Sequence, residues 1–288
     1  MRTRPAFRFA PSPNGHLHMG HAYSALLNFD LAQRFDGRFV LRIEDIDPAR
    51  SRPEFLAAVM DDLKWLGLVW EEPVRKQSEH FADYRSAADK LAAMGLLYPC
   101  FASRAEIVAA AGPAAPADPD GAPFYPGLWR GTTLASVQQR TQSCEPFALR
   151  LDTQLALAGF GKPLTWTAFE PDQPFVSHSR TADPGRWGDA VIVRKETPTS
   201  YHLSVVVDDD LQGITHVVRG QDLEAATDLH RLLQALLGLP SPAYHHHALV
   251  TDPKGRKLSK SLGDTSLAQM RGEGASPGDI RRLVGLSI

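Results

Sequence analysis

The hydrophobic period of the chain changes within one short stretch, RFAPSPNGHLHMGHAYSALLN at residues 8–28. The alternation around Phe7 and Phe9 predicts a strand that ends at the prolines that follow. After Gly20, apolar residues recur at i, i+3, i+4 and i+7, the spacing of a packed helix. RFVLRIED, at 38–45, then has the dense apolar run of a strand buried on both faces. A strand, a helix and a second strand at this spacing predict the parallel unit of an α/β fold.

The same alternation of strands and helices extends along most of the chain. Helices are predicted around 56–63, 78–94 and 226–236, where apolar residues follow a helical period. Three segments are interpreted as further strands of the parallel sheet: DAVIVRK at 189–195, YHLSVVVDD at 201–209 and ITHVVRG at 214–220. A last strand-like stretch reaches Val250.

The segment 96–185 differs in composition from its surroundings and is interpreted as an inserted α+β subdomain. Residues 109–126 are rich in Pro, Ala and Gly, which predicts a mobile surface loop. EPFALRLD at 145–152 and PLTWTAFE at 163–170 alternate as antiparallel strands do. The predicted divisions are two halves of a parallel-sheet domain at 1–95 and 186–250, the insertion at 96–185, and a basic loop with a short helical segment at 251–288.

Charge and cysteine content indicate which partners and which compartment are expected for the protein. The formal net charge is −2, so a nucleic acid would have to be held by local basic patches. Cys100 and Cys144 are the only cysteines, too few for a disulfide framework, and we expect both to be small apolar side chains in a reducing compartment. The chain has neither the apolar run of a signal peptide nor that of a membrane span, which predicts a cytoplasmic protein without a membrane partner.

Two motifs are suited to binding phosphate groups. HMGH, at 18–21, lies between a strand end and a helix N-terminus, where free N–H groups favour an anion. By itself, HMGH could equally well be a pair of solvated histidines in a turn. KGRKLSKS, at 254–261, has four basic residues, two serines and a glycine, a composition that can close over a polyphosphate or simply be solvated. Their occurrence in this order across one parallel fold favours the phosphate interpretation for both.

These motifs resemble the HIGH and KMSKS signatures of the class I aminoacyl-tRNA synthetases of the glutamyl type. The resemblance continues through LRIEDIDPARS at 41–51, TSYHLSVVVDDDLQGITHVVRGQDL at 199–223 and GRKLSKSLGD at 255–264. It covers most of the chain outside the middle insertion. It implies a Rossmann-like parallel-sheet catalytic domain that is split by an inserted α+β subdomain.

The resemblance also implies the reaction, in which glutamate attacks the α-phosphate of ATP to give glutamyl-adenylate and pyrophosphate. Mg²⁺ is expected to accompany ATP. His18, Gly20 and His21 are expected to contact ATP, and Lys260, with Lys257 nearby, to stabilise the transition state. No resident metal site is predicted, because we interpret the acids at 208–210 as a polar strand end.

The substrate has two carboxylates and one ammonium group, and the family positions offer matching charges. By resemblance, Arg8 and Arg219 bind the carboxylates and Glu44 the ammonium. Three further residues are expected to complete the pocket: Ala10, Ser12 and Tyr201. The alternative for an arginine and an acid at strand ends is a structural ion pair.

The chain is most similar to the short branch of this family, the glutamyl-Q tRNA(Asp) synthetases. Only 27 residues follow Ser261, whereas a further domain needs about 50, so no anticodon-binding domain is expected. The resemblance implies activation of L-glutamate without tRNA and its transfer to the queuosine at the wobble position of tRNA(Asp). The alternatives are a truncated glutamyl-tRNA synthetase that charges the 3′ end of tRNA(Glu), a non-catalytic tRNA-binding paralogue, and a small-molecule adenylyltransferase.

The insertion departs from the zinc-binding pattern of many short members, C-x-C followed by Y-x-x-x-C. Cys100 and Tyr125 match this pattern, but Ala102 and Trp129 stand where two thiolates belong. We therefore expect no structural zinc, since a closed site needs four ligands. Trp129 and its apolar neighbours are expected to close the insertion by packing instead. No role is assigned to the three histidines at 245–247.

Overall fold

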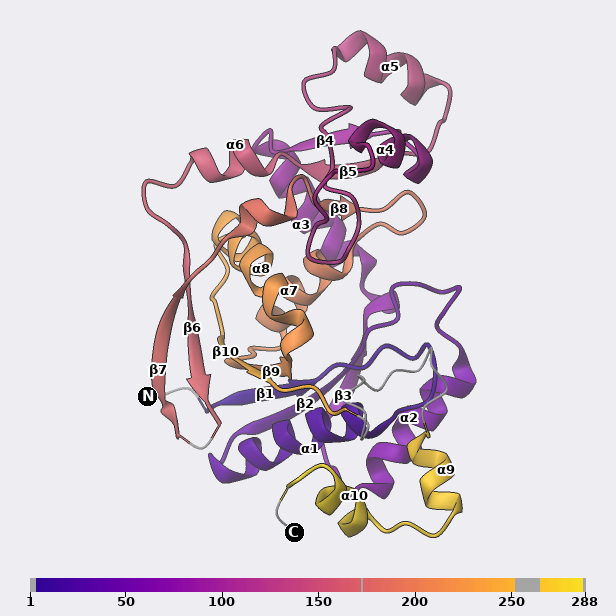
Figure 1. Cartoon of the computed structure of the whole chain (residues 1–288), viewed down its shortest axis with the longest axis vertical. Helices are drawn as coiled ribbons and strands as arrows, with labels where there is room; N and C mark the ends of the chain where they lie inside the picture. Colours follow the sequence, from indigo (N-terminus) through magenta and orange to yellow (C-terminus); the bar gives the residue numbers. More distant parts are fainter. Residues whose placement is uncertain (1–3, 172, 252–264, 287–288) are drawn as a thin grey trace.

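The computed structural model describes residues 4–171, 173–251 and 265–286. Its main layer contains two sheets (Figure 1). One has the order β1-β2-β3 and is parallel throughout: β1 is Ala6–Phe9, β2 is Arg38–Ile43 and β3 is Glu71–Lys76. The other has the order β7-β6-β10-β9: β6 is Thr165–Glu170, β7 is Gln173–Thr181, β9 is His216–Gly220 and β10 is Ala243–His247. The pairs β6–β10 and β10–β9 are parallel, and β7 is antiparallel to β6.

The two sheets meet edge to edge at β1 and β9. The Thr215 N–H donates to the Ala6 carbonyl at 3.1 Å, and the Ala6 N–H donates to the Thr215 hydroxyl at 2.8 Å. The parallel α/β layer predicted from the strand–helix–strand pattern is thus built from segments far apart in the chain, and it includes β6 and β7, which lie within the segment 96–185 that the sequence analysis interpreted as an insertion.

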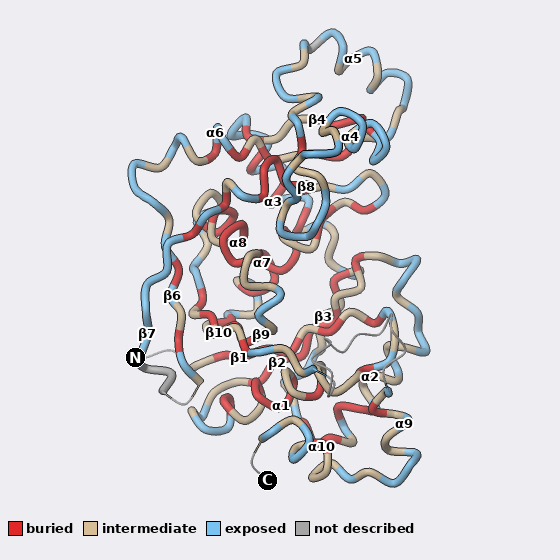
Figure 2. The backbone as a smooth tube through the Cα atoms, viewed as in Figure 1, coloured by how far each residue is buried: buried red, intermediate tan, exposed pale blue. Residues whose placement is uncertain are grey.

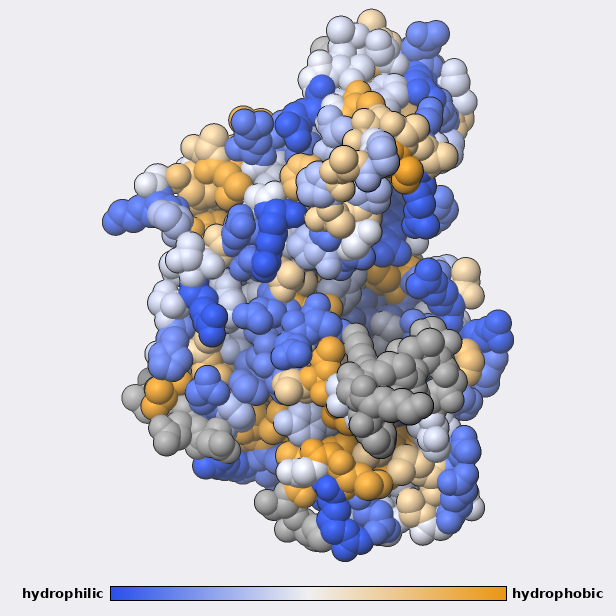
Figure 3. All heavy atoms as spheres, viewed as in Figure 1, coloured by the Kyte–Doolittle hydropathy of each residue, from blue (hydrophilic) through white to orange (hydrophobic). Residues whose placement is uncertain are grey.

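Helices cover both faces of this layer (Figure 1). One face is covered by α1 (Met19–Arg34), and α2 (Pro53–Trp65), α9 (Leu267–Gly272) and α10 (Pro277–Leu283) complete the apolar core on that side. The other face carries α3 (Phe81–Ala93), α7 (Tyr201–Leu211) and α8 (Glu224–Leu237), which share a second apolar core. Short 3-10 turns lie at Gln77–Glu79, Pro184–Trp187 and Gln221–Leu223. Apolar side chains show on the visible surface beside α10 (Figure 3).

A third sheet lies at the far end of the molecule. Its strands are antiparallel in the order β4-β5-β8: β4 is Leu97–Cys100, β5 is Ala148–Leu151 and β8 is Val191–Val193. Three helices flank it: α4 (Arg104–Ala111), α5 (Leu134–Gln142) and α6 (Thr153–Ala158). This end is the most exposed part of the chain (Figure 2), with residues 112–133 free of helix and strand and Tyr125 buried within that stretch.

The prediction was wrong for two of the segments assigned to the parallel sheet. YHLSVVVDD forms the helix α7, which begins after Ser200, whose hydroxyl accepts from the Leu203 N–H. The helix is buried around most of its circumference, so its three consecutive valines resemble the apolar run of a buried strand. DAVIVRK contains β8, which pairs antiparallel with β5 and not with the parallel layer. The acids at 208–210 therefore lie in a helix, not at a strand end.

The interpretation of Cys144 was also wrong. The residue is exposed in the turn after α5, with a φ of 53°, whereas Cys100 is buried as expected. Residues 109–111, assigned to the loop, are the end of α4. No helix within the described residues is long and apolar enough to cross a membrane.

Candidate active site

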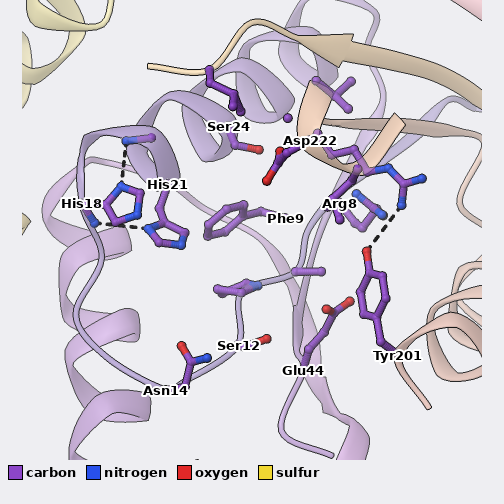
Figure 4. Close-up of a pocket in the computed structure, with 18 of the residues that line it drawn as sticks. Arg8, Phe9, Ser12, Asn14, His18, His21, Ser24, Glu44, Tyr201 and Asp222 are labelled. Carbon is purple, nitrogen blue, oxygen red and sulfur yellow. Dashed lines mark hydrogen bonds between the residues drawn. The ribbon is translucent and has the colours of Figure 1, made fainter. Parts of the chain in front are cut away.

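A cleft of about 1050 Å³ opens where β1, β2 and β9 end and α1 begins (Figure 4). All predicted site residues in the described ranges line this cleft: Arg8, Ala10, Ser12, His18, Gly20, His21, Glu44, Tyr201 and Arg219. Lys257 and Lys260 lie outside the described residues. The carboxyl ends of parallel strands are the usual place for a ligand in such a fold, because helix N-termini and loops converge there.

The two histidines of HMGH form the start of α1. The His18 Nδ1 accepts a hydrogen bond from the Gly20 N–H at 3.1 Å, and the His18 N–H donates to the His21 Nδ1 at 3.3 Å. The ring centroids lie 3.9 Å apart. A Cβ at Gly20 would lie 3.0 Å from the His18 ring, so glycine permits this close cap. Each neutral imidazole then has its proton on Nε2, a donor at the positive end of a helix dipole.

Arg8 is fixed by a buried carboxylate behind the cleft. Its Nε lies 3.2 Å from Asp209 Oδ1, and the same oxygen accepts from Arg42 Nη1 at 2.8 Å. Burial alone would raise the pKa of Asp209, but the two guanidinium groups outweigh it and hold that pKa below its usual range. Asp209 is therefore a permanent anion that neutralises part of the charge of both arginines.

Glu44 lies at the end of β2 and points into the cleft (Figure 4). Its Oε1 accepts from Arg42 Nη2 at 3.1 Å, and its backbone N–H donates to the Pro11 carbonyl at 3.0 Å. Burial raises the pKa of this carboxyl group, although Arg42 and Arg8 act against the shift. A cationic ligand group beside Glu44 would favour its ionised form.

Arg219, in β9, approaches the cleft from the other sheet. Its Nη1 donates to the Tyr201 hydroxyl at 3.4 Å, and its side chain is 5% exposed. Burial raises the pKa of Tyr201, so this hydroxyl group is neutral and can accept. The predicted residues of the cleft thus combine two guanidinium groups from β1 and β9 with one carboxylate from the end of β2, and Arg50, Arg52 and Asp222 line the same cleft.

The sequence analysis missed Arg42 and Asp209, which organise the site without being part of its surface. Arg42 is fully buried, and it also lies 3.8 Å from Asp208. The available signal was a charged residue inside the otherwise apolar run RFVLRIED, which requires a buried partner. Asp222 and His247 also line the cleft and were not singled out for it.

Comparison with known proteins decides the family. The family described as tRNA synthetases class I (E and Q), catalytic domain, matches residues 6–287. The chain belongs to this family. It is 47% identical over 286 residues to the glutamyl-Q tRNA(Asp) synthetase of Rhodobacter capsulatus, covering 97% of this chain and 99% of that protein. It is 41% identical to the glutamyl-Q tRNA(Asp) synthetase of Symbiobacterium thermophilum, covering 94% of this chain and 82% of that protein.

A solved structure of a class I synthetase supports the same assignment. The glutamate tRNA ligase from Elizabethkingia meningosepticum, in complex with its amino acid, matches with a TM-score of 0.76 and 26% identity. The match covers 98% of this chain but 60% of that one, so this chain spans well under two thirds of the longer ligase. The predicted Rossmann-like fold of the class I synthetase ligases is confirmed.

The zinc-pattern positions lie together in the insertion. Cys100 Sγ is 3.3 Å from the Tyr125 hydroxyl, and Trp129 packs against Phe101 with ring centroids 4.9 Å apart. The guanidinium of Arg150 lies 3.9 Å above the centre of the Tyr125 ring. Among the described residues, no three His, Cys, Asp or Glu side chains are grouped so that they could hold a metal ion.

Proposed function

We propose that the chain activates L-glutamate with ATP, without tRNA, and transfers it to the queuosine at the wobble position of tRNA(Asp). The observation that carries the first step is that the predicted charged residues, Arg8, Arg219 and Glu44, line one cleft. Two guanidinium groups match two carboxylates, and one carboxylate matches an ammonium group. Ala10, Ser12 and Tyr201 line the same space and complete the pocket for the glutamate side chain.

The HMGH end of the cleft suits the triphosphate of ATP. The start of α1 provides the positive end of a helix dipole, and His18 and His21 present imidazole donors. Mg²⁺ enters as part of the ATP substrate, where it neutralises phosphate charge. We further propose that Lys260, with Lys257 nearby in the KLSKS segment, stabilises the transition state. Since glutamate itself is the nucleophile, the role of the protein is to align the reactants and stabilise charge.

The nature of the acceptor rests on the relatives. The relatives of which the match covers 99% and 82% are named glutamyl-Q tRNA(Asp) synthetase, whereas it covers 60% of the two glutamate tRNA ligases compared. The HMGH geometry is intact, which favours a catalytic protein over a tRNA-binding paralogue.

The decisive experiment offers the protein ATP, labelled glutamate and tRNA(Asp) with or without queuosine, and tRNA(Glu) in parallel. We expect label only on the queuosine-containing tRNA(Asp), and stable to removal of the 3′ end. Label on the 3′ end of tRNA(Glu) would instead identify a truncated glutamyl-tRNA synthetase. Glutamate-dependent exchange of pyrophosphate into ATP, measured without any tRNA, tests the activation step separately.

A further inference from the structure

Arg219 is held from behind by side chains that do not line the cleft. Its Nη2 donates to the Thr227 hydroxyl at 2.8 Å, and its Nη1 lies 3.4 Å from His230 Nδ1. Thr227 and His230 both lie on α8 and are fully buried. The third contact, to Tyr201 at 3.4 Å, comes from the cleft side.

These contacts fix the plane of the guanidinium but do not use all of its donors. A guanidinium has five N–H donors, and the three contacts use two on Nη1 and one on Nη2. Nε is buried and has no hydrogen-bond partner among the described residues. One N–H on Nη2 and the N–H of Nε therefore remain unused by these contacts, and an arginine that lines the cleft can donate to a carboxylate bound there.

The direction of each hydrogen bond follows from the arginine. Because Arg219 can only donate, His230 accepts through Nδ1 and has its proton on Nε2, which lies 3.2 Å from His202 Nδ1. The Thr227 hydroxyl also accepts from Arg219 and has its own proton to give, and His246 Nε2 lies 2.9 Å away. Burial lowers the pKa of His246 to about 2 and that of His230 well below 6.5, so both rings are neutral.

We propose that Thr227 and His230 are positioning residues that fix the orientation of the Arg219 guanidinium at the wall of the cleft and so set the affinity for one carboxylate of the substrate. This inference rests on the proposed function, in which Arg219 binds glutamate. Thr227 and His230 touch no substrate atom in this arrangement. They act only through the orientation of the guanidinium.

The test compares matched pairs of variants in glutamate-dependent pyrophosphate exchange without tRNA. Thr227→Val removes the acceptor but keeps the shape, and Thr227→Ser keeps a hydroxyl group. We expect Thr227→Val to raise the KM for glutamate about tenfold, the effect of losing one hydrogen bond to a charged group, and Thr227→Ser to recover most of the loss. The KM for ATP and kcat at saturating glutamate should stay close to those of the wild type.

A second pair of variants, together with a control variant away from the cleft, distinguishes loss of positioning from general destabilisation of the fold. His230→Asn keeps an acceptor near the Nδ1 position, and His230→Leu removes it, so only the latter should raise the KM for glutamate. Thr153→Val removes a buried threonine hydroxyl that donates to the Gly188 carbonyl at 2.6 Å, away from the cleft, and should lower the Tm without changing that KM.

Three results would overturn the inference. One is a wild-type KM for glutamate in both Thr227→Val and His230→Leu, another is equal impairment in the two members of a pair, and the third is an equal rise of the KM for ATP. If Thr227→Val does not fold, the His230 pair decides. Absence of glutamate-dependent exchange in the wild-type protein would count against the proposed function itself, which is a different outcome.

Discussion

Arg8 Nε lies 3.2 Å from Asp209 Oδ1, and both side chains are almost completely buried. The carboxylate comes from α7 and the guanidinium from β1, so the helix fixes the orientation of the arginine before any ligand arrives. Preorganisation of this kind lowers the entropy lost on binding. An acid that touches no substrate atom thus contributes to the affinity of the cleft.

Asp209→Asn should therefore weaken both stability and glutamate binding. The variant leaves Arg8 and Arg42 buried without their shared anion, and breaking a buried ion pair costs about 3–5 kcal/mol. Urea unfolding and the KM for glutamate measure the two effects. Asp210→Asn, at the neighbouring and less buried position, is the matched control, and equal behaviour of the two variants would contradict this role of Asp209.

Mild acid should destabilise the fold through its buried histidines. Burial and the nearby Arg219 hold the pKa of His230 well below 6.5, and burial lowers that of His202 to about 3. Below pH 6.5 the unfolded chain binds protons that the folded chain does not, so the free energy of unfolding falls as the pH is lowered. Above pH 6.5 this contribution is fully present.

Urea unfolding at a series of pH values measures this slope, which is at most about 1.4 kcal/mol per pH unit for each histidine. His230→Asn removes one titrating group and should flatten the slope. His178→Gln, at an exposed position, should keep the slope of the wild type. A slope unchanged in His230→Asn would show that this histidine does not contribute.

The insertion should be stable without zinc. Cys100 and Tyr125 contact each other directly, and Arg150 stacks on the Tyr125 ring, so packing and a cation–π contact occupy the region of the zinc pattern. Elemental analysis should find no stoichiometric zinc, and a chelator should leave Tm and activity unchanged. One tightly held zinc per chain would refute this expectation.

Arg150→Met tests the stacked cation in the same region. The variant keeps an apolar stem but loses the charge over Tyr125, along with the hydrogen bond from Nη1 to the Asp189 carbonyl at 2.7 Å. We expect a lower Tm at unchanged KM for glutamate, since the insertion sheet lies at the far end of the molecule from the cleft. A raised KM would show that the two regions are coupled.

Lys260→Ala should slow adenylate formation by about a hundredfold or more, the usual effect of removing one preorganised charge-stabilising group. Pyrophosphate exchange measures the rate, and the KM for glutamate should change little because that pocket is formed by other residues. Lys64→Ala, at an exposed position on α2, is the control. Near-normal exchange in Lys260→Ala would mean that the KLSKS segment is not catalytic in this protein.

The helices and strands that could be predicted from the sequence are those with a clear local hydrophobic periodicity. The change of period between β1 and α1 is visible because Phe7 and Phe9 alternate and the following residues form one helical stripe. The helix α7 was misassigned because it is buried around most of its circumference, which removes the stripe from Val205–Val207.

The ion pairs of the site could not be predicted for a different reason. Arg42 and Asp209 lie 167 positions apart in the chain, and no local pattern connects them. The motif residues that line the cleft were found because each belongs to a stretch that resembles the family. The side chains that hold them in place lie one layer deeper and belong to no recognisable motif.

The two sheets meet edge to edge at a seam between β1 and β9, and this seam affects the order in which parts of the protein can fold. Ala6 and Thr215 are hydrogen-bonded across 209 positions of sequence, and the two arginines of the cleft lie on either side of this seam. A contact of such long range forms slowly, because a large loop must close first. During synthesis, β1 can pair with β2 early, but it acquires its second neighbour, β9, only after residue 215 has been made. The cleft is therefore completed late in folding, and a bound ligand that spans Arg8 and Arg219 would hold the first strand against one that is made about 200 residues later.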